Sequence, residues 1–268
     1  MLSLFPKYKA YFALCFAAVF MLSAALFSDG LLNGKILTVL LLFLILCFAG
    51  VEIFATVQHQ RLLYFLYHDL RPVDFLTLYK PLLQKKGIRA NVQFSMSLYL
   101  CKAYTVLGEF EEGLAVLNSA PTLSKSKELT AKALLSAARC DLYLFSENLQ
   151  AASEEYAFLK TTAKQLEKSK KALSDIGLER LRIHLAILKG ACTLDDADIL
   201  RDLLRRKGSL LYHLELRYLL GRIYSIVGNL EFSRSYFQEV SDKGQALYIA
   251  AQAKDTLENL TEQGFRGA

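Results

Sequence analysis

The sequence contains little that would interrupt a helix. Only four of its 268 residues are proline, and tryptophan is absent. Proline inside a helix removes a hydrogen bond and clashes with the preceding turn, so its scarcity permits long helices over almost the whole chain. No stretch alternates strictly between apolar and polar residues, and the sequence therefore predicts no β-strand.

The cysteines form neither a disulfide framework nor a zinc motif. There are five, an odd number, and they lie far apart at Cys15, Cys47, Cys101, Cys140 and Cys192. Disulfide-rich secreted domains carry an even number of cysteines, and zinc sites carry them in close pairs such as CxxC. The pattern predicts reduced, buried thiols in a protein that faces a reducing compartment.

Motifs that carry chemistry are also missing. The sequence has no GxxxxGK[ST], no GxGxxG after a strand and no GxSxG. Its four histidines lack the spacing of metal ligands. The acidic cluster at residues 195–198 is interpreted as the start of a helix, where negative charge is favourable. We expect no catalytic residue, no cofactor and no metal. The net charge of +6 is small for this length, so no nucleic-acid partner is expected.

Two long apolar runs are present near the N-terminus, at residues 10–27 and 36–57. The shorter run would span about 27 Å as a helix, enough to cross the hydrocarbon core of a bilayer. Basic residues flank the two runs on their outer sides, at Lys7, Lys9, Arg61 and Arg71. The positive-inside rule therefore predicts a two-pass hairpin with both termini in the cytoplasm, in contact with lipid through residues 10–57.

One alternative remains open for the first run. Small residues at 23–25 would fit a signal-peptidase site, in which case the first span would be cleaved rather than retained. Glu52 is the one ionisable residue in the second run, and we interpret it either as an interfacial carboxylate or as a contact to a partner.

Beyond residue 57 every segment shows the apolar recurrence of a helix. We therefore divide the chain into a transmembrane hairpin at 1–57, a membrane-proximal helical pair at 58–90 and a helical-repeat domain at 91–268. In the repeat domain the predicted helices come in pairs, at residues 92–107 and 109–118, 127–145 and 147–168, 173–189 and 194–207, and 210–227 and 230–242. A last helix at 245–261 would cap the array.

The pair at 210–242 carries the clearest pattern, with Gly221, Tyr224, Gly228, Ser233 and Phe237 at fixed spacing. This pattern resembles the tetratricopeptide repeat, in which a small residue, an aromatic and a turn glycine follow one another. Weaker copies contain Cys101, Tyr104, Gly108 and Gly113, then Cys140, Tyr143 and Ala152, and a marginal copy contains Leu185, Leu188, Leu194, Ala197 and Leu204. The small residues of the second helices fall at 113, 152, 197 and 233. The resemblance implies an α-solenoid of antiparallel helix pairs, and another type of degenerate helical repeat is the alternative.

The resemblance also implies a binding site. In this family the first helix of each pair lines a concave groove, which here would present Lys102, Arg182, Lys189, Tyr218 and Arg222. Four of these side chains are basic, so the expected ligand is a protein or an acidic peptide. An ordinary solvated surface is the alternative.

We therefore expect an all-α protein that holds a partner at a membrane as a scaffold or assembly factor. The fold-level similarity to two-span, helical-repeat bacterial proteins points to the cell membrane of a bacterium. One alternative is an accessory subunit that uses the hairpin as its interface in a larger membrane complex. A further alternative is an enzyme of envelope metabolism.

Overall fold

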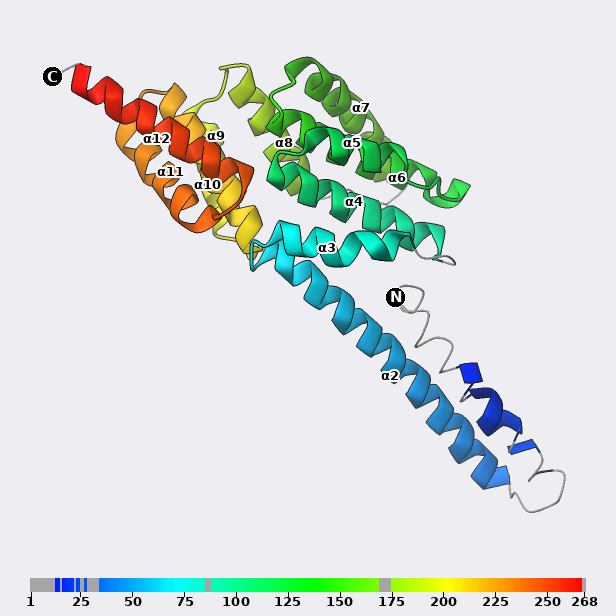
Figure 1. Ribbon diagram of the computed structural model, residues 1–268. Helices are drawn as coiled ribbons and strands as arrows, with labels where there is room; N and C mark the ends of the chain where they lie inside the picture. The colour runs from blue at the N-terminus through cyan, green and yellow to red at the C-terminus, as the bar shows by residue number, and fades with distance from the viewer. Residues whose placement is uncertain are drawn as a thin grey trace.

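The computed structural model describes residues 34–84, 88–168 and 175–266, together with short stretches between 13 and 27. All regular structure in these ranges is helical, which confirms the all-α class (Figure 1). Among the described residues, no helix is found that is both long enough and apolar enough to cross a membrane. The predicted first span at 10–27 lies partly outside the described residues, and the two-span hairpin gains no support from the structure.

One long helix, α2, carries the chain into the helical array (Figure 1). It runs from Gly34 to Tyr67 without a break, so the boundary predicted at residues 57–58 falls inside a continuous helix. Its C-terminal turns pack on the array, and Leu63 and Leu66 of α2, with Leu70 just beyond its end, belong to the main hydrophobic core. Large apolar side chains nearer its N-terminus are instead exposed, among them Val39, Leu42, Phe43, Ile45, Leu46 and Ile53.

The short helix α3 fixes the end of α2 to the array. It spans Pro72–Leu83 and begins with proline, whose fixed φ suits the first turn of a helix. The ring Nε2 of His59 on α2 lies 2.8 Å from the hydroxyl of Tyr79 on α3, and both side chains are buried. Because α3 also packs against the next helix, α2 and the array form one continuous core.

The described residues from 88 onward form four helical hairpins and a last helix, close to the predicted boundaries. The hairpins are α4 (Ala90–Leu107) with α5 (Phe110–Asn118), α6 (Lys125–Phe145) with α7 (Leu149–Lys168), α8 (Asp175–Leu188) with α9 (Leu194–Leu204), and α10 (Leu210–Ile226) with α11 (Leu230–Gly244). The last helix is α12 (Tyr248–Arg266). We call α4, α6, α8 and α10 the inner helices.

The four hairpins repeat the same backbone turn. Each inner helix ends with one residue of positive φ, at Gly108, Glu147, Gly190 and Gly228. In each turn the next backbone N–H donates to the carbonyl five residues back, with distances between 2.9 and 3.0 Å. This is the Schellman bond, which satisfies a carbonyl left free at a helix end. The repetition is therefore visible in the backbone as well as in the side chains.

Glu147 is the exception among these turn residues. A residue with a Cβ in the left-handed region costs roughly 1 kcal/mol relative to glycine. Its carboxylate reaches across the array to Arg222 on α10, with 2.5 Å between Oε1 and Nη1. An ion pair between hairpins that are distant in sequence thus occupies the position where the other turns have glycine.

The array closes on itself rather than staying open. Consecutive inner helices contact one another, and α12 packs against α10, α11 and the first inner helix, α4. The ring of Tyr248 on α12 meets Phe110 edge-on, with 5.3 Å between ring centroids. The same tyrosine leaves no space for a Cβ on Gly108. The last helix therefore covers the end of the fourth hairpin, as predicted, and also returns to the first.

Small residues mark the closest contacts inside the hairpins. The predicted small positions of the second helices are Gly113, Ala152, Ala197 and Ser233, and all four are buried. A Cβ on Gly221 would lie between 2.8 and 3.1 Å from three ring atoms of Phe237. Gly221 is thus required because an aromatic ring packs directly on the backbone of α10.

We predict that Gly221→Ala lowers the free energy of unfolding by about 1–3 kcal/mol, because the rigid ring of Phe237 must move. Gly177→Ala on α8 is the matched control, since a Cβ there meets no atom within 4 Å. The control is expected to raise stability by about 0.5–1 kcal/mol through better helix propensity. Urea unfolding followed by circular dichroism measures both, and equal effects of the two substitutions would contradict the packing argument.

Candidate functional site

Four charged side chains meet at the centre of the array, one from each inner helix. They are Lys102 on α4, Asp141 on α6, Arg180 on α8 and Glu215 on α10, and we call them the charge cluster. The Lys102 ammonium lies 2.8 Å from Asp141 Oδ2 and 2.6 Å from Glu215 Oε1. Arg180 Nη2 lies 2.6 Å from Asp141 Oδ1, and Arg180 Nη1 lies 3.9 Å from Glu215. Two positive and two negative groups therefore balance.

The charge cluster is largely removed from water. Its most exposed side chain, Lys102, retains 18% of its accessible surface, and Glu215 retains 3%. Burial alone lowers the pKa of Lys102, but Asp141 and Glu215 outweigh it and the net shift is upward. Burial likewise raises the pKa of Asp141, but Arg180 and Lys102 hold it well below its ordinary value. Lys102 and Asp141 therefore stay charged at neutral pH, which suits a structural ion network better than proton transfer.

The four members occupy shifted positions in the repeat. Lys102 and Asp141 each lie six residues before the positive-φ residue of their turn, a position that His184 and Arg222 hold in the other inner helices. Arg180 lies one helical turn before His184, and Glu215 lies two turns before Arg222. In the later repeats the inner helices thus meet through residues further from their C-terminal turns. This is the shift expected when successive hairpins are arranged as a superhelix.

The structure separates the five predicted groove residues. Lys102 is in the charge cluster, and Tyr218 is buried with 6% of its surface exposed. Arg222 lies against Tyr218 and pairs with Glu147. Arg182 points instead to Glu179 and Asp196, at 2.7 and 2.6 Å, and Lys189 is exposed at the end of α8. A peptide could not reach Lys102 or Tyr218 without separating the inner helices.

The sequence pattern placed Lys102 on the inner face but did not place Arg180 there. In the sequence analysis the third hairpin was matched to the repeat pattern through Leu185 and Leu188. That match rotated α8 about its axis and wrongly put Arg182 on the inner face. The glycine at position 190 was the sequence feature that would have given the correct match. The structure shows that Gly190, with a φ of 65°, forms the same turn as Gly108 and Gly228. Counting back from Gly190 puts His184 and Arg180 on the inner face.

His184 is fully buried beside the charge cluster. Neither ring nitrogen has a hydrogen-bond partner in the part of the chain that the structure describes, and the ring meets Phe145 edge-on at 4.9 Å. Burial, together with the positive charge of Arg180, lowers the pKa of His184 to about 3. A buried neutral imidazole without partners costs stability, and it becomes more costly when the unfolded chain can take up a proton.

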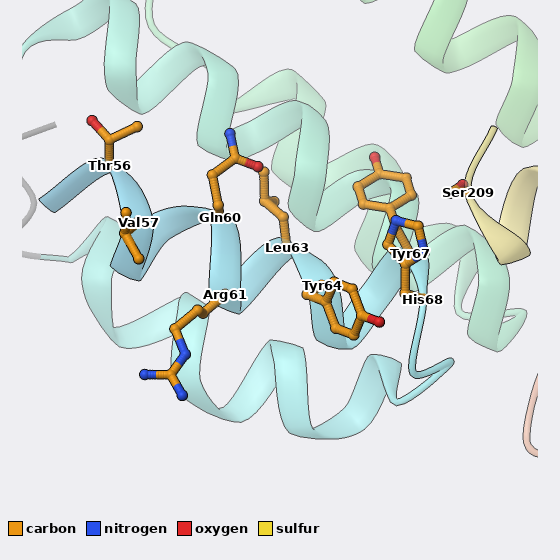
Figure 2. A pocket seen from close by; sticks show the side chains of 9 residues that line it. All are labelled: Thr56, Val57, Gln60, Arg61, Leu63, Tyr64, Tyr67, His68 and Ser209. Atoms are coloured by element: carbon orange, nitrogen blue, oxygen red, sulfur yellow. The ribbon is translucent and has the colours of Figure 1, made fainter. Parts of the chain in front are cut away.

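A pocket of about 460 Å³ lies along α2 where this helix meets the array (Figure 2). Side chains from successive turns of α2 line it, and Ser209, which precedes α10, closes one end. Tyr67 lines the pocket and also packs against the main hydrophobic core. Burial raises the pKa of its phenol to about 12, and the nearby charge of Lys102 opposes this shift. Within the described residues, no group of three or more potential ligands could hold a metal ion.

We predict that the charge cluster tolerates balanced changes better than unbalanced ones. Lys102→Met leaves a net negative charge in the interior and is expected to cost about 3–5 kcal/mol of unfolding free energy. Adding Glu215→Gln restores the balance around the Asp141–Arg180 pair, so the double variant should be more stable than Lys102→Met alone. Lys189→Met, on the surface, should change stability by less than about 0.5 kcal/mol. Denaturant unfolding would contradict the argument if the costs of Lys102→Met and Glu215→Gln simply added.

We also predict that stability falls between pH 6.5 and pH 5. In this window the unfolded chain binds a proton at His184 and the folded chain does not, because the folded pKa lies near 3. The contribution is at most about 1.4 kcal/mol per pH unit below 6.5. His184→Leu should flatten this dependence, whereas a His213→Gln control should keep it. Thermal unfolding at several pH values provides the measurement, and an unchanged slope in His184→Leu would refute the assignment.

The chain matches no known family, no curated protein and no solved structure. The tetratricopeptide resemblance therefore rests on the sequence pattern, while the helical-repeat architecture rests on the repeated turns and hairpins described above.

Proposed function

We propose that the protein is a non-enzymatic scaffold in which a closed helical-repeat array is held at a bilayer by its N-terminal apolar segment and binds a partner protein. The observation that carries the proposal is the division of α2. Its C-terminal turns are part of the core of the array, whereas Val39, Ile45, Leu46 and Ile53 each expose more than 60% of their surface. Exposed apolar surface of this extent is unfavourable in water and indicates contact with lipid or protein.

The length of α2 is compatible with this arrangement. Its 34 residues extend for about 51 Å at 1.5 Å per residue. If the N-terminal turns of α2 lie against the hydrocarbon of a bilayer, the remaining turns are long enough to carry the array away from it. The basic residues on the outer sides of the two apolar runs place the array, in this proposal, on the cytoplasmic side.

The interior of the array supports a binding role more than a catalytic one. The charge cluster is internally compensated and buried, and Lys102, Asp141 and Arg180 are held in their charged forms by their neighbours. A partner would therefore contact the outside of the array. The turn between α10 and α11 is one place to search, because Ile226, Val227, Leu230 and Phe232 are all exposed there.

A second candidate is an accessory subunit whose interface is α2 itself. The same exposed side chains favour it, since they could pack against helices of another membrane protein as well as against lipid. Photo-crosslinking distinguishes the two: crosslinks from position 232 to a protein support the scaffold, and protein crosslinks from position 46 alone support the accessory subunit.

Membrane attachment is tested by flotation of the full-length protein with lipid. We expect the wild-type chain to float, and a variant with Leu42→Asp, Leu46→Asp and Ile53→Asp to remain in the soluble or aggregated fraction, because charges within a bilayer cost several kcal/mol each. A variant with Val227→Asp and Phe232→Asp should float like the wild type. Wild-type protein that stays soluble and monomeric without lipid would disprove the attachment.

A further inference from the structure

We propose that the pocket along α2 binds the head group and upper acyl chain of an anionic phospholipid. This inference rests on the proposed attachment to a bilayer and names the molecule that the attachment site would select. The pocket is lined by Thr56, Val57, Gln60, Arg61, Leu63, Tyr64, Tyr67, His68 and Ser209 (Figure 2).

The charge of the lining points to an anionic ligand. Arg61 forms no ion pair within the described residues, and no carboxylate lines the pocket. Other arginines near the array, such as Arg71, Arg182 and Arg222, each have an acidic partner. A guanidinium can donate two parallel hydrogen bonds to a phosphate, so Arg61 is the group that would hold the head group. Gln60 points to the other side of α2, and Ser209 lies at the far end of the pocket (Figure 2).

The apolar part of the lining points to a ligand with a hydrocarbon chain. Val57 and Leu63 lie in the pocket, and Ile53 and Phe54 continue the exposed apolar surface from Val57 toward the N-terminal part of α2. A free phosphate would leave this apolar surface exposed to water. A strongly acidic peptide would place polar backbone groups against it, which is unfavourable. A phospholipid covers the apolar end and the charged end with one molecule.

The order of the side chains along α2 matches the depth profile of a bilayer. Arg61 follows Val57 by four residues, or about 6 Å along the helix axis. If the hydrocarbon boundary lies near Val57, the guanidinium reaches the phosphate level, where long basic side chains extend toward head groups. Tyr64 lies about one turn further on and stacks on His68 with 4.6 Å between ring centroids. Aromatic residues are typical of this interfacial layer.

A second pocket strengthens the assignment of Arg61. It has a volume of about 410 Å³, and its lining also includes Arg61 and Tyr64. These two residues thus lie between two hollows on one helix, and both side chains are exposed to solvent. Asp69 lines the second pocket only, so an anion is favoured in the first.

The test measures which lipid the full-length protein keeps. The protein is purified in micelles that contain equal amounts of phosphatidylglycerol and phosphatidylcholine, and native mass spectrometry counts the retained lipids. We expect the wild type to retain phosphatidylglycerol in preference to phosphatidylcholine by roughly tenfold, the scale of one charge-assisted contact. Arg61→Gln should abolish the preference, and Arg61→Lys should keep most of it. Lys164→Gln, which removes one exposed positive charge from α7, is the control and should behave like the wild type.

Several outcomes would overturn the inference. Equal lipid retention by Arg61→Gln and Lys164→Gln would show that Arg61 does not hold the head group. Displacement of the lipid by inorganic phosphate at millimolar concentration would make the pocket a phosphate site, and capture of an acidic peptide by a crosslinker at position 61 would make it a protein site. Flotation separates this inference from the proposed function: loss of lipid preference with normal flotation affects the pocket alone, and failure to float affects the attachment.

Discussion

The fold depends on the balanced charges at its centre. Each of the four inner helices contributes one charged side chain, so no hairpin can leave the array without leaving a charge unpaired away from water. Apolar contacts alone would allow helices of a repeat protein to slide or turn against one another. Because an ion pair requires its partners within a few ångströms, the charge cluster specifies the order and level of the inner helices. The Arg222–Glu147 pair and the contact of Tyr248 with Phe110 reinforce the same closure.

Closure decides which surfaces the array leaves exposed. An open repeat array offers its first helices as a groove, whereas here the corresponding faces hold the array together. Lys102 and Tyr218 are therefore structural neighbours of the core, and the exposed surfaces are the turns, the outer helices and α2. In the proposed attachment to a bilayer, the connection of α2 to the array through Leu66, Tyr79 and the buried His59 would transmit the orientation of α2 to the repeat domain.

Much of the architecture was predictable from local patterns. Helix propensity, the spacing of apolar residues and the glycines that end the inner helices act over a few residues, so the pairs of helices could be located from α3 to α12. The small residues Gly113, Ala152, Ala197 and Ser233 were also predictable, because a hairpin brings its own two helices together at a fixed offset. The shift of the contact positions along the inner helices was not predictable, since it accumulates over several hairpins. Arg180 was missed because the third hairpin was aligned through its leucines rather than through the turn at Gly190.

The sequence by itself determined the helical class, the hairpin boundaries and the apolar character of the first part of the chain. Those properties follow from neighbours a few positions apart. Only the tertiary structure decided that the array closes, that α12 returns to α4, and that Lys102 pairs with Asp141 and Glu215. These contacts join residues dozens of positions apart, and they depend on how far each hairpin rotates against the last. That rotation is set by the packing of many side chains together, which no local spacing records.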